Sequence, residues 1–210
     1  MTDNKTNVKR VSISRGNRKM GAIPSVSLPP VVTCAAGCPC AKKCYAVKMF
    51  RIYKNVKASY QNNLDILQGD PARYWEDILM AVKASRYFRF HVSGDIPNSE
   101  YFANMVSVAA NNPHCEVLAF TKQYDIVNSY LDQRNGYLPK NLHIIFSRWS
   151  PEWDVAIKNP HDLPMSAVIF RGQDSGQYEK ICGGNCFECA CQGVGCWALQ
   201  NGETIAFYEH

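Results

Sequence analysis

The sequence contains no long apolar run. None of its apolar stretches approaches the roughly 20 residues that a membrane-spanning helix needs. The first 20 residues carry charge and have no apolar core, unlike a secretory signal. There is also no internal repeat and no low-complexity tract. These absences predict a cytoplasmic protein that has no membrane partner.

The sequence has the composition of a folded protein, and it contains many cysteines. Hydrophobic residues make up 46% of the 210 residues, which predicts a globular core, and ten residues are cysteine. Disulfides are disfavoured in a reducing compartment, so clustered cysteines indicate metal ligands or catalysts. They form two groups, Cys34, Cys38, Cys40 and Cys44, and Cys182, Cys186, Cys189, Cys191 and Cys196. Cys115 stands alone in an apolar run, and we expect it to be an inert core residue.

The formal net charge of +5 is a weak argument for nucleic acid. Six of the basic residues fall in the first 20 positions, where we expect a solvated arm. Cysteine ligands bind metal as thiolates, which would lower the net charge by about 3 if two clusters were bound. The charge therefore gives only weak support for nucleic acid as a partner.

Strand and helix patterns alternate along the chain. We expect an extended segment at 24–30 and strands at 31–33, 87–93, 116–121, 142–147 and 168–171. We expect helices at 41–67, with a break near Asn62-Asn63, and at 71–86, 99–111 and 125–133, the third capped by Asn98 or Ser99. The alternation predicts an α/β fold: a partial (β/α) barrel of about five to six mostly parallel strands, or a doubly wound sheet. Five strands are too few for a full eight-stranded barrel.

Residues able to do chemistry follow several of these strands. In parallel α/β folds, ligands collect at the carboxyl ends of the strands. We expect to find Cys34, 93–95, 121–122 and 147–149 there. Alternation along 87–93 places Phe88, Phe90 and Val92 on one face. It places Arg89, His91 and Ser93 on the other, towards a cleft. An internal salt bridge between Arg89 and Asp95 is the structural alternative to ligand contact.

The N-terminal cysteine loop is strong evidence for a metal site. Four cysteines fall between residues 34 and 44, Gly37 allows a tight turn, and Pro39 stiffens it. Cys44 opens a helix, whose N-terminal dipole favours thiolate and anionic cluster sulfur. Soft thiolates select iron–sulfur or zinc over hard cations.

Several short motifs make the chain resemble a known family. A cysteine triad after a first strand, with aromatic Tyr45 beside its last cysteine, is similar to radical S-adenosylmethionine (SAM) enzymes. The spacing, Cys34-x5-Cys40-x3-Cys44, departs from their usual Cys-x3-Cys-x2-Cys. With the segments 23–24, 27–30, 33–34, 44–46 and 91–95, it resembles the phage-encoded gene product 88 domain family, from about residue 17 to 197. Host cytoplasm would then be the location.

The resemblance implies a cofactor and a reaction. Cys34, Cys40 and Cys44 would hold three irons of a [4Fe–4S] cluster, leaving the fourth iron open for SAM. A fourth thiolate from Cys38 would block that position, and its role stays open. Reductive cleavage of SAM would need a reductase or flavodoxin-type electron donor, and the substrate is unknown.

The resemblance also implies a set of cofactor contacts. The backbone at Ser93 and Gly94, together with the Asp95 carboxylate, would hold the SAM amino group. Further contacts to the cofactor are expected from the remaining polar candidates, which are Tyr45, Arg89, His91, Thr121, Lys122 and Ser147.

The C-terminal group also indicates metal. Cys182-x3-Cys186-x2-Cys189 has the literal radical SAM spacing, but only 21 residues follow Cys189, too few to build a barrel. We expect an auxiliary [4Fe–4S] cluster on Cys182, Cys186, Cys189 and Cys196, with Cys191 as a substitute. Structural zinc is the alternative, because Cys-x2-Cys pairs also make zinc sites.

Three regions and three functions follow. We expect a basic, loosely structured arm at 1–22, a partial barrel at 23–178 and a Cys-rich auxiliary segment at 179–210. The chain is then a radical SAM-type enzyme, a non-catalytic iron–sulfur binding or electron-transfer protein, or a zinc-stabilised nucleic-acid binder.

Overall fold

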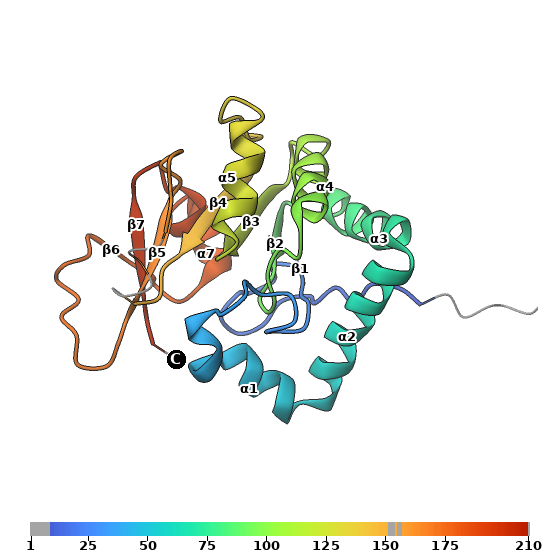
Figure 1. The fold of residues 1–210 in the computed structure, drawn as a ribbon, viewed down its shortest axis with the longest axis horizontal. Coiled ribbons are helices and arrows are strands. Elements are labelled where there is room, and N and C mark those ends of the chain that lie inside the picture. Colours follow the sequence, from blue (N-terminus) through green and yellow to red (C-terminus); the bar gives the residue numbers. More distant parts are fainter. Residues whose placement is uncertain (1–8, 151–153, 155–156, 210) are drawn as a thin grey trace, which may run out of the picture.

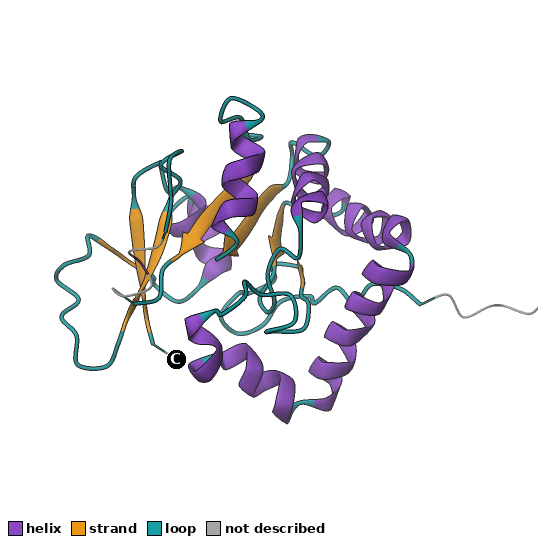
Figure 2. Ribbon diagram, in the orientation of Figure 1, coloured by secondary structure: helices purple, strands orange, loops and turns teal. Residues whose placement is uncertain are grey.

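The chain forms an open sheet of parallel strands with helices packed against it (Figures 1 and 2). The computed structural model describes residues 9–150, 154 and 157–209. Within them the strands are β1 (Ser25–Val26), β2 (Tyr87–Phe90), β3 (Glu116–Thr121), β4 (Leu142–Ser147), β5 (Met165–Ile169), β6 (Lys180–Ile181) and β7 (Thr204–Tyr208). Their order across the sheet is β1-β2-β3-β4-β5-β7-β6. The parallel α/β class is confirmed. The expected strand number was too low, and the sheet does not close because β1 and β6 remain edges.

Helices in the described residues connect most of the strands. They are η1 (Pro39–Lys43), α1 (Tyr45–Ile52), α2 (Lys54–Gly69), α3 (Pro71–Lys83), α4 (Ser99–Ala110), α5 (Tyr124–Asp132), α7 (Cys186–Gln192) and η2 (Gly195–Trp197). The Asn98 side chain accepts a 2.8 Å hydrogen bond from the Tyr101 amide and so caps α4 as expected. No described helix has both the length and the apolar character that a membrane crossing requires.

Several expected boundaries are wrong, and the strand expected at 87–93 already ends at Phe90. Residues 31–33 form a turn, since Val31 has φ 71° and follows two prolines, and the first strand is β1 instead. The helical stretch 41–67 breaks at Tyr53, which is extended, and not near Asn62-Asn63. Asn63 is fully buried inside α2, where its side chain bonds the Ser12 and Ser27 carbonyls. The last expected strand, 168–171, lies three residues earlier as β5.

The C-terminal segment is part of the sheet. β7 lies between β5 and β6 and pairs with β5 from Met165–Thr204 to Ile169–Tyr208. The Cys-rich segment between β6 and β7 is therefore held at both of its ends by strand pairing.

Apolar side chains form one layer on each face of the sheet. Phe88 and Phe90 point into the layer shared with α2 to α5. Tyr87 and Leu118 point into the opposite layer, which α7 and η2 cover. The alternation expected for β2 is thus confirmed within Tyr87–Phe90, and it leaves the Arg89 side chain on the α7 face.

Residues 9–22, expected to be a loose arm, pack against the body of the molecule. The Val11 amide donates to the Asp77 carboxylate at 2.9 Å, and Met20 is fully buried. Ser14 forms an isolated antiparallel bridge with Ser25 of β1. Residues 1–8 of the expected arm lie outside the described residues.

Candidate metal and cofactor site

One large cavity, of about 1050 Å³, lies at the carboxyl ends of the parallel strands. Its wall includes residues that follow β2, β3 and β4, and residues from both cysteine groups. Most of the candidate residues named from sequence therefore meet in a single space, although Cys34 and Cys196 are 162 positions apart in the chain.

The N-terminal cysteines gather on the loop that leads into α1. Cys38 Sγ lies 2.9 Å from Cys40 Sγ, and Cys40 also hydrogen-bonds with Cys44. These hydrogen bonds from Cys40 lower the pKa of the Cys38 thiol to about 7 and that of Cys44 to about 6. Burial raises the pKa of the Cys34 thiol to about 11. The loop thus brings Cys34, Cys40 and Cys44 together, and it brings Cys38 with them.

The C-terminal cysteines differ in their exposure to solvent. Cys182, Cys186, Cys189 and Cys196 pack against the apolar layer beneath α7, whereas Cys191 is exposed. Burial raises the pKa of the Cys196 thiol to about 12, and the neighbouring Cys182 adds to the rise. The four cysteines chosen from the sequence are therefore those that share one neighbourhood.

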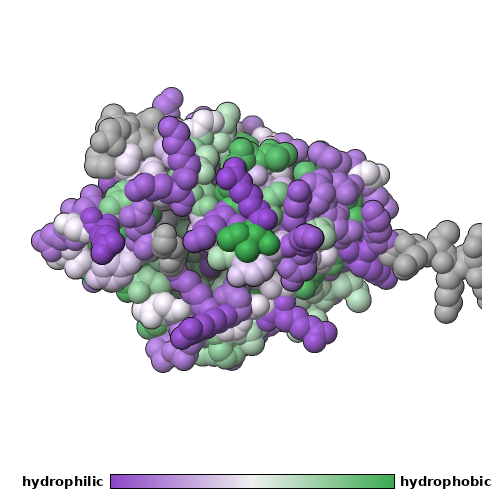
Figure 3. All heavy atoms as spheres, turned by 90° about the horizontal axis from the view of Figure 1, so that it is seen from below, coloured by the Kyte–Doolittle hydropathy of each residue, from purple (hydrophilic) through white to green (hydrophobic). Residues whose placement is uncertain are grey.

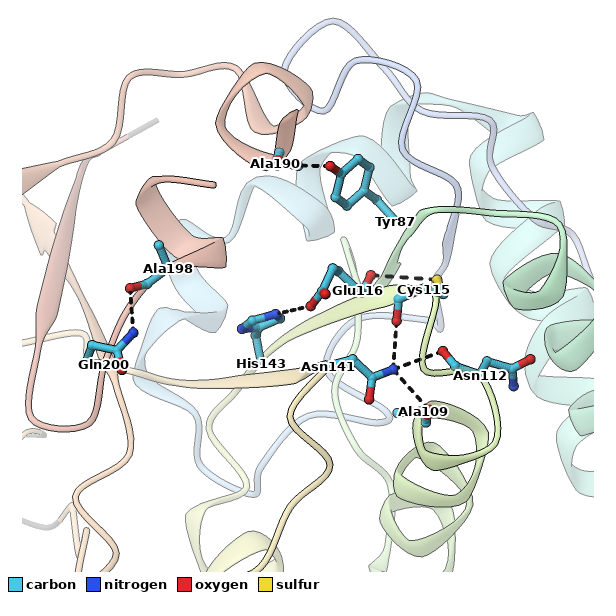
Figure 4. A network of polar contacts seen from close by, with 10 residues as sticks. All are labelled: Tyr87, Ala109, Asn112, Cys115, Glu116, Asn141, His143, Ala190, Ala198 and Gln200. Carbon is cyan, nitrogen blue, oxygen red and sulfur yellow. Dashed lines mark hydrogen bonds and ion pairs between the residues drawn. The ribbon is translucent and has the colours of Figure 1, made fainter. Parts of the chain in front are cut away.

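Aromatic residues fasten this segment to the sheet (Figure 4). The Tyr87 hydroxyl in β2 donates to the Ala190 carbonyl of α7 at 3.0 Å. The Trp197 indole donates to the Cys186 carbonyl at 3.2 Å, and its ring packs on Tyr87 and on His143. In the same view His143 points towards Glu116. The His143 Nε2 and Glu116 Oε2 atoms lie 2.7 Å apart. Sequence analysis missed Trp197 as an anchor, although it stands directly after Cys196.

Within the described residues, no group of three or more His, Cys, Asp or Glu side chains has the arrangement that a single metal ion requires. The donor chemistry of both groups is nonetheless that of soft-metal sites, because the polar atoms that converge are cysteine sulfurs.

Arg89 reaches towards the C-terminal group. Its Nη1 lies 4.0 Å from Cys186 Sγ, and its guanidinium lies 4.9 Å from the centre of the Phe120 ring. Its buried Nε has no hydrogen-bond partner among the described residues. The alternative salt bridge to Asp95 does not form: Arg89 reaches Cys186 instead, and the Asp95 carboxylate accepts hydrogen bonds from Thr121 and Lys122.

The Ser93-Gly94 turn holds the chain that leads into the first cysteine loop. Ser93 Oγ donates to the Leu28 carbonyl at 3.1 Å, and the Leu28 amide donates to the Ser93 carbonyl at 3.0 Å. A Cβ added at Gly94, which has φ 78°, would lie 2.6 Å from Thr33 Oγ1. Only glycine permits this close approach. The turn therefore holds the segment that leads to Cys34 in place.

Asp95 ties the ends of two strands together. Its Oδ1 accepts hydrogen bonds from Thr121 Oγ1 at 2.6 Å and from the Ile96 amide at 2.8 Å, and its Oδ2 accepts from the Lys122 amide at 2.8 Å. Burial is the main influence on its pKa and raises it. About four acceptor positions exist on a carboxylate, so one remains for a ligand.

His91 ends the strand alternation. Its φ of 59° turns the ring to the helix face, where Nε2 lies 3.0 Å from the Tyr101 hydroxyl, which lies 2.8 Å from that of Tyr74. If Tyr74 donates to Tyr101 and Tyr101 to Nε2, only His91 Nδ1 stays unpaired. If His91 Nε2 instead donated to Tyr101 and Tyr101 to Tyr74, the Tyr74 hydroxyl proton would have no acceptor as well. Counting hydrogen bonds therefore assigns the proton to Nδ1. Burial lowers the pKa of His91 to about 3, so the ring is neutral.

The remaining candidates border the same cavity. The Tyr45 hydroxyl donates to the Val92 carbonyl at 2.5 Å. Ser147 Oγ lies 3.4 Å from Ser166 Oγ. Lys43 was not predicted: its Nζ pairs with Glu209 at 3.0 Å and joins the first cysteine loop to the residue after β7. No pattern in the sequence signals that pair.

Fold and site together define an open, all-parallel α/β protein with two cysteine groups facing one cavity. The family model for Gene product 88 matches residues 2–196. The chain belongs to the Gene product 88 family, as its motifs predicted. No curated protein and no solved structure matches it significantly.

Proposed function

We propose that this protein is a radical SAM-type iron–sulfur enzyme of unknown substrate. Cys34, Cys40 and Cys44 would hold a [4Fe–4S] cluster, and Cys182, Cys186, Cys189 and Cys196 a second one. A cluster held by the first three cysteines would supply one-electron cleavage of a carbon–sulfur bond of SAM, which would release methionine and a radical. The electron would come from a reductase or flavodoxin-type donor.

One observation carries the proposal: both cysteine groups line the same cavity at the carboxyl ends of parallel strands. Cavities of about 300–1,000 Å³ hold small-molecule ligands, and this one, of about 1050 Å³, has room for a molecule of the size of SAM. A purely structural metal site would have no need of such a space.

The chain's own residues supply an environment for the cofactor. The Ser93-Gly94 turn sets the position of the cysteine loop, and Asp95 keeps one acceptor position free for an amino group. Arg89 Nε is a buried donor without a partner among the described residues, and it lines the cavity. The guanidinium group of Arg89 would offer a bound carboxylate a charged donor.

A second candidate is a non-catalytic iron–sulfur protein. The observation that favours it is the closeness of Cys38 to Cys40, at 2.9 Å. A fourth thiolate from Cys38 would complete the cluster and leave no open iron. A zinc-stabilised protein is the third candidate, with zinc on the C-terminal cysteines.

Anaerobic purification with iron, sulfide and zinc analysis separates these candidates. The enzyme predicts that SAM changes the electron paramagnetic resonance signal of the reduced protein, and that dithionite slowly releases 5′-deoxyadenosine. Cys38→Ala should keep this response, and Cys191→Ala, a change at an exposed cysteine, is the control. A response that appears only in Cys38→Ala would establish the second candidate, and colourless zinc protein would reject both.

A further inference from the structure

The stretch that carries the first cysteine group is also the most basic part of the chain. No Asp or Glu stands between Asp3 and Asp65, and the first 64 residues hold twelve of the 23 Lys and Arg residues. From residue 65 onward, 17 acidic residues outnumber 11 basic ones. The modest net charge of +5 therefore conceals two regions of opposite sign.

Six of these basic residues form a surface on η1, α1 and the start of α2, which we term the basic face. They are Lys42, Lys43, Lys48, Arg51, Lys54 and Lys57, and all six are exposed. Within the described residues only Lys43 of the six makes an ion pair. Viewed from below, this side of the molecule shows purple hydrophilic side chains around smaller green apolar areas (Figure 3).

The basic face also exposes apolar and aromatic side chains. α1 buries only Ala46, while Met49, Ile52 and Tyr53 are 38%, 56% and 49% exposed. Aromatic rings between cations are the features with which proteins bind unpaired bases and phosphates.

The basic face continues into the cavity. Lys43 and Met49 belong to both, and Lys122 also lines the cavity. A flexible strand lying on α1 can therefore reach the cavity, which a duplex or a flat membrane cannot enter.

We propose that the basic face binds single-stranded nucleic acid and leads it to the cavity. Protein interfaces are depleted in lysine, whereas five of these six residues are lysine, so an acidic protein fits less well. None of the six basic residues is a cysteine, so the proposal goes beyond the cluster chemistry and does not rest on it.

The test is fluorescence anisotropy with labelled 20-nucleotide RNA and DNA single strands, on anaerobically purified protein at 50 to 200 mM salt. The triple variant Lys48→Gln/Arg51→Gln/Lys54→Gln should bind at least tenfold more weakly, with the salt slope reduced by about 2. The matched control Lys83→Gln/Arg134→Gln/Lys140→Gln removes the same charge from exposed positions at the end of α3 and after α5 and should stay within twofold. RNA and DNA that differ in affinity would identify recognition of the 2′-hydroxyl.

A second pair of variants tests stacking. Tyr53→Ala should weaken binding about fivefold or more without changing the salt slope, whereas Tyr137→Ala, at 66% exposure on the loop after α5, should not. Equal losses in the two triple variants would overturn the proposal. So would binding of phosphatidylserine vesicles or an acidic redox protein in place of nucleic acid. Iron content and the SAM response, measured on the same samples, test the proposed enzyme separately.

Discussion

The Asp95 carboxylate, beyond the end of β2, accepts a 2.6 Å hydrogen bond from the Thr121 hydroxyl at the end of β3. Both side chains are buried, at 6% and 1% exposure. The contact joins two strand ends at the cavity wall. Asp95 is thus a structural link as well as a candidate ligand to the SAM amino group, and the two roles can be measured apart.

Thr121→Val should lower the free energy of unfolding by about 1–3 kcal/mol, because it leaves a buried carboxylate short of one donor. Denaturant unfolding measures the change. Thr204→Val in β7 is the matched control and should change stability by less than about 0.5 kcal/mol, because its side chain is not fully buried. Similar losses in the two variants would contradict a special role for the Asp95 contact.

Local patterns predicted part of this fold well. The strands 116–121 and 142–147 match β3 and β4, and the Asn98 cap holds, because alternation and capping act over a few residues. β1 and β6 have two residues each and exist through pairing with a neighbour, which leaves little local signal. The positive φ of His91 is likewise set by surrounding packing, so the expected strand to residue 93 ran too far.

The residues of the site could be predicted from the sequence, but their arrangement in space could not. Cysteine spacing named both groups, and the helix of α7 then explains why Cys191 points away from the others. Spacing could not show that the two groups share one cavity, since that depends on β7 inserting between β5 and β6. Nor did the net charge show the acid-free stretch, which only the order of the residues reveals.

Cysteine variants should show which members of the C-terminal group bind metal. If two [4Fe–4S] clusters bind, wild-type protein should hold about eight irons per chain. Cys196→Ala should lose about four, because its partly buried thiol lies beside the other three cysteines. Exposed Cys191→Ala should lose none, as measured by iron and sulfide analysis. About four irons with one zinc in the wild type would instead place zinc at this site.

Arg89 should tune the C-terminal cluster if one binds. A guanidinium 4.0 Å from Cys186 Sγ stabilises added negative charge, so Arg89→Gln should make the midpoint potential more negative. We expect a shift on the order of 20–60 mV, where 59 mV is a tenfold change for one electron. Arg148→Gln is the control, because Arg148 is paired with Asp154 at 2.9 Å. An unchanged potential in Arg89→Gln would remove Arg89 from this role.

His91 should make stability depend on pH below neutrality. Burial lowers its pKa to about 3 in the folded protein, whereas an unfolded histidine titrates near 6.5. The unfolded state therefore takes up a proton first as the pH falls. The stabilisation is complete above about pH 6.5 and is lost progressively towards pH 3. Between pH 7 and pH 5.5 this residue alone should cost about 1 kcal/mol of unfolding free energy.

The variant His91→Asn isolates that contribution. Asparagine tolerates the positive φ of 59° and does not titrate, so the variant is less stable at pH 7 but should lose about 1 kcal/mol less between pH 7 and 5.5. His114→Asn, at an exposed position, should keep the wild-type pH dependence. Urea unfolding at both pH values gives the comparison. If His91→Asn and wild type lose the same stability, His91 is not the buried neutral histidine that its contacts with Tyr101 require.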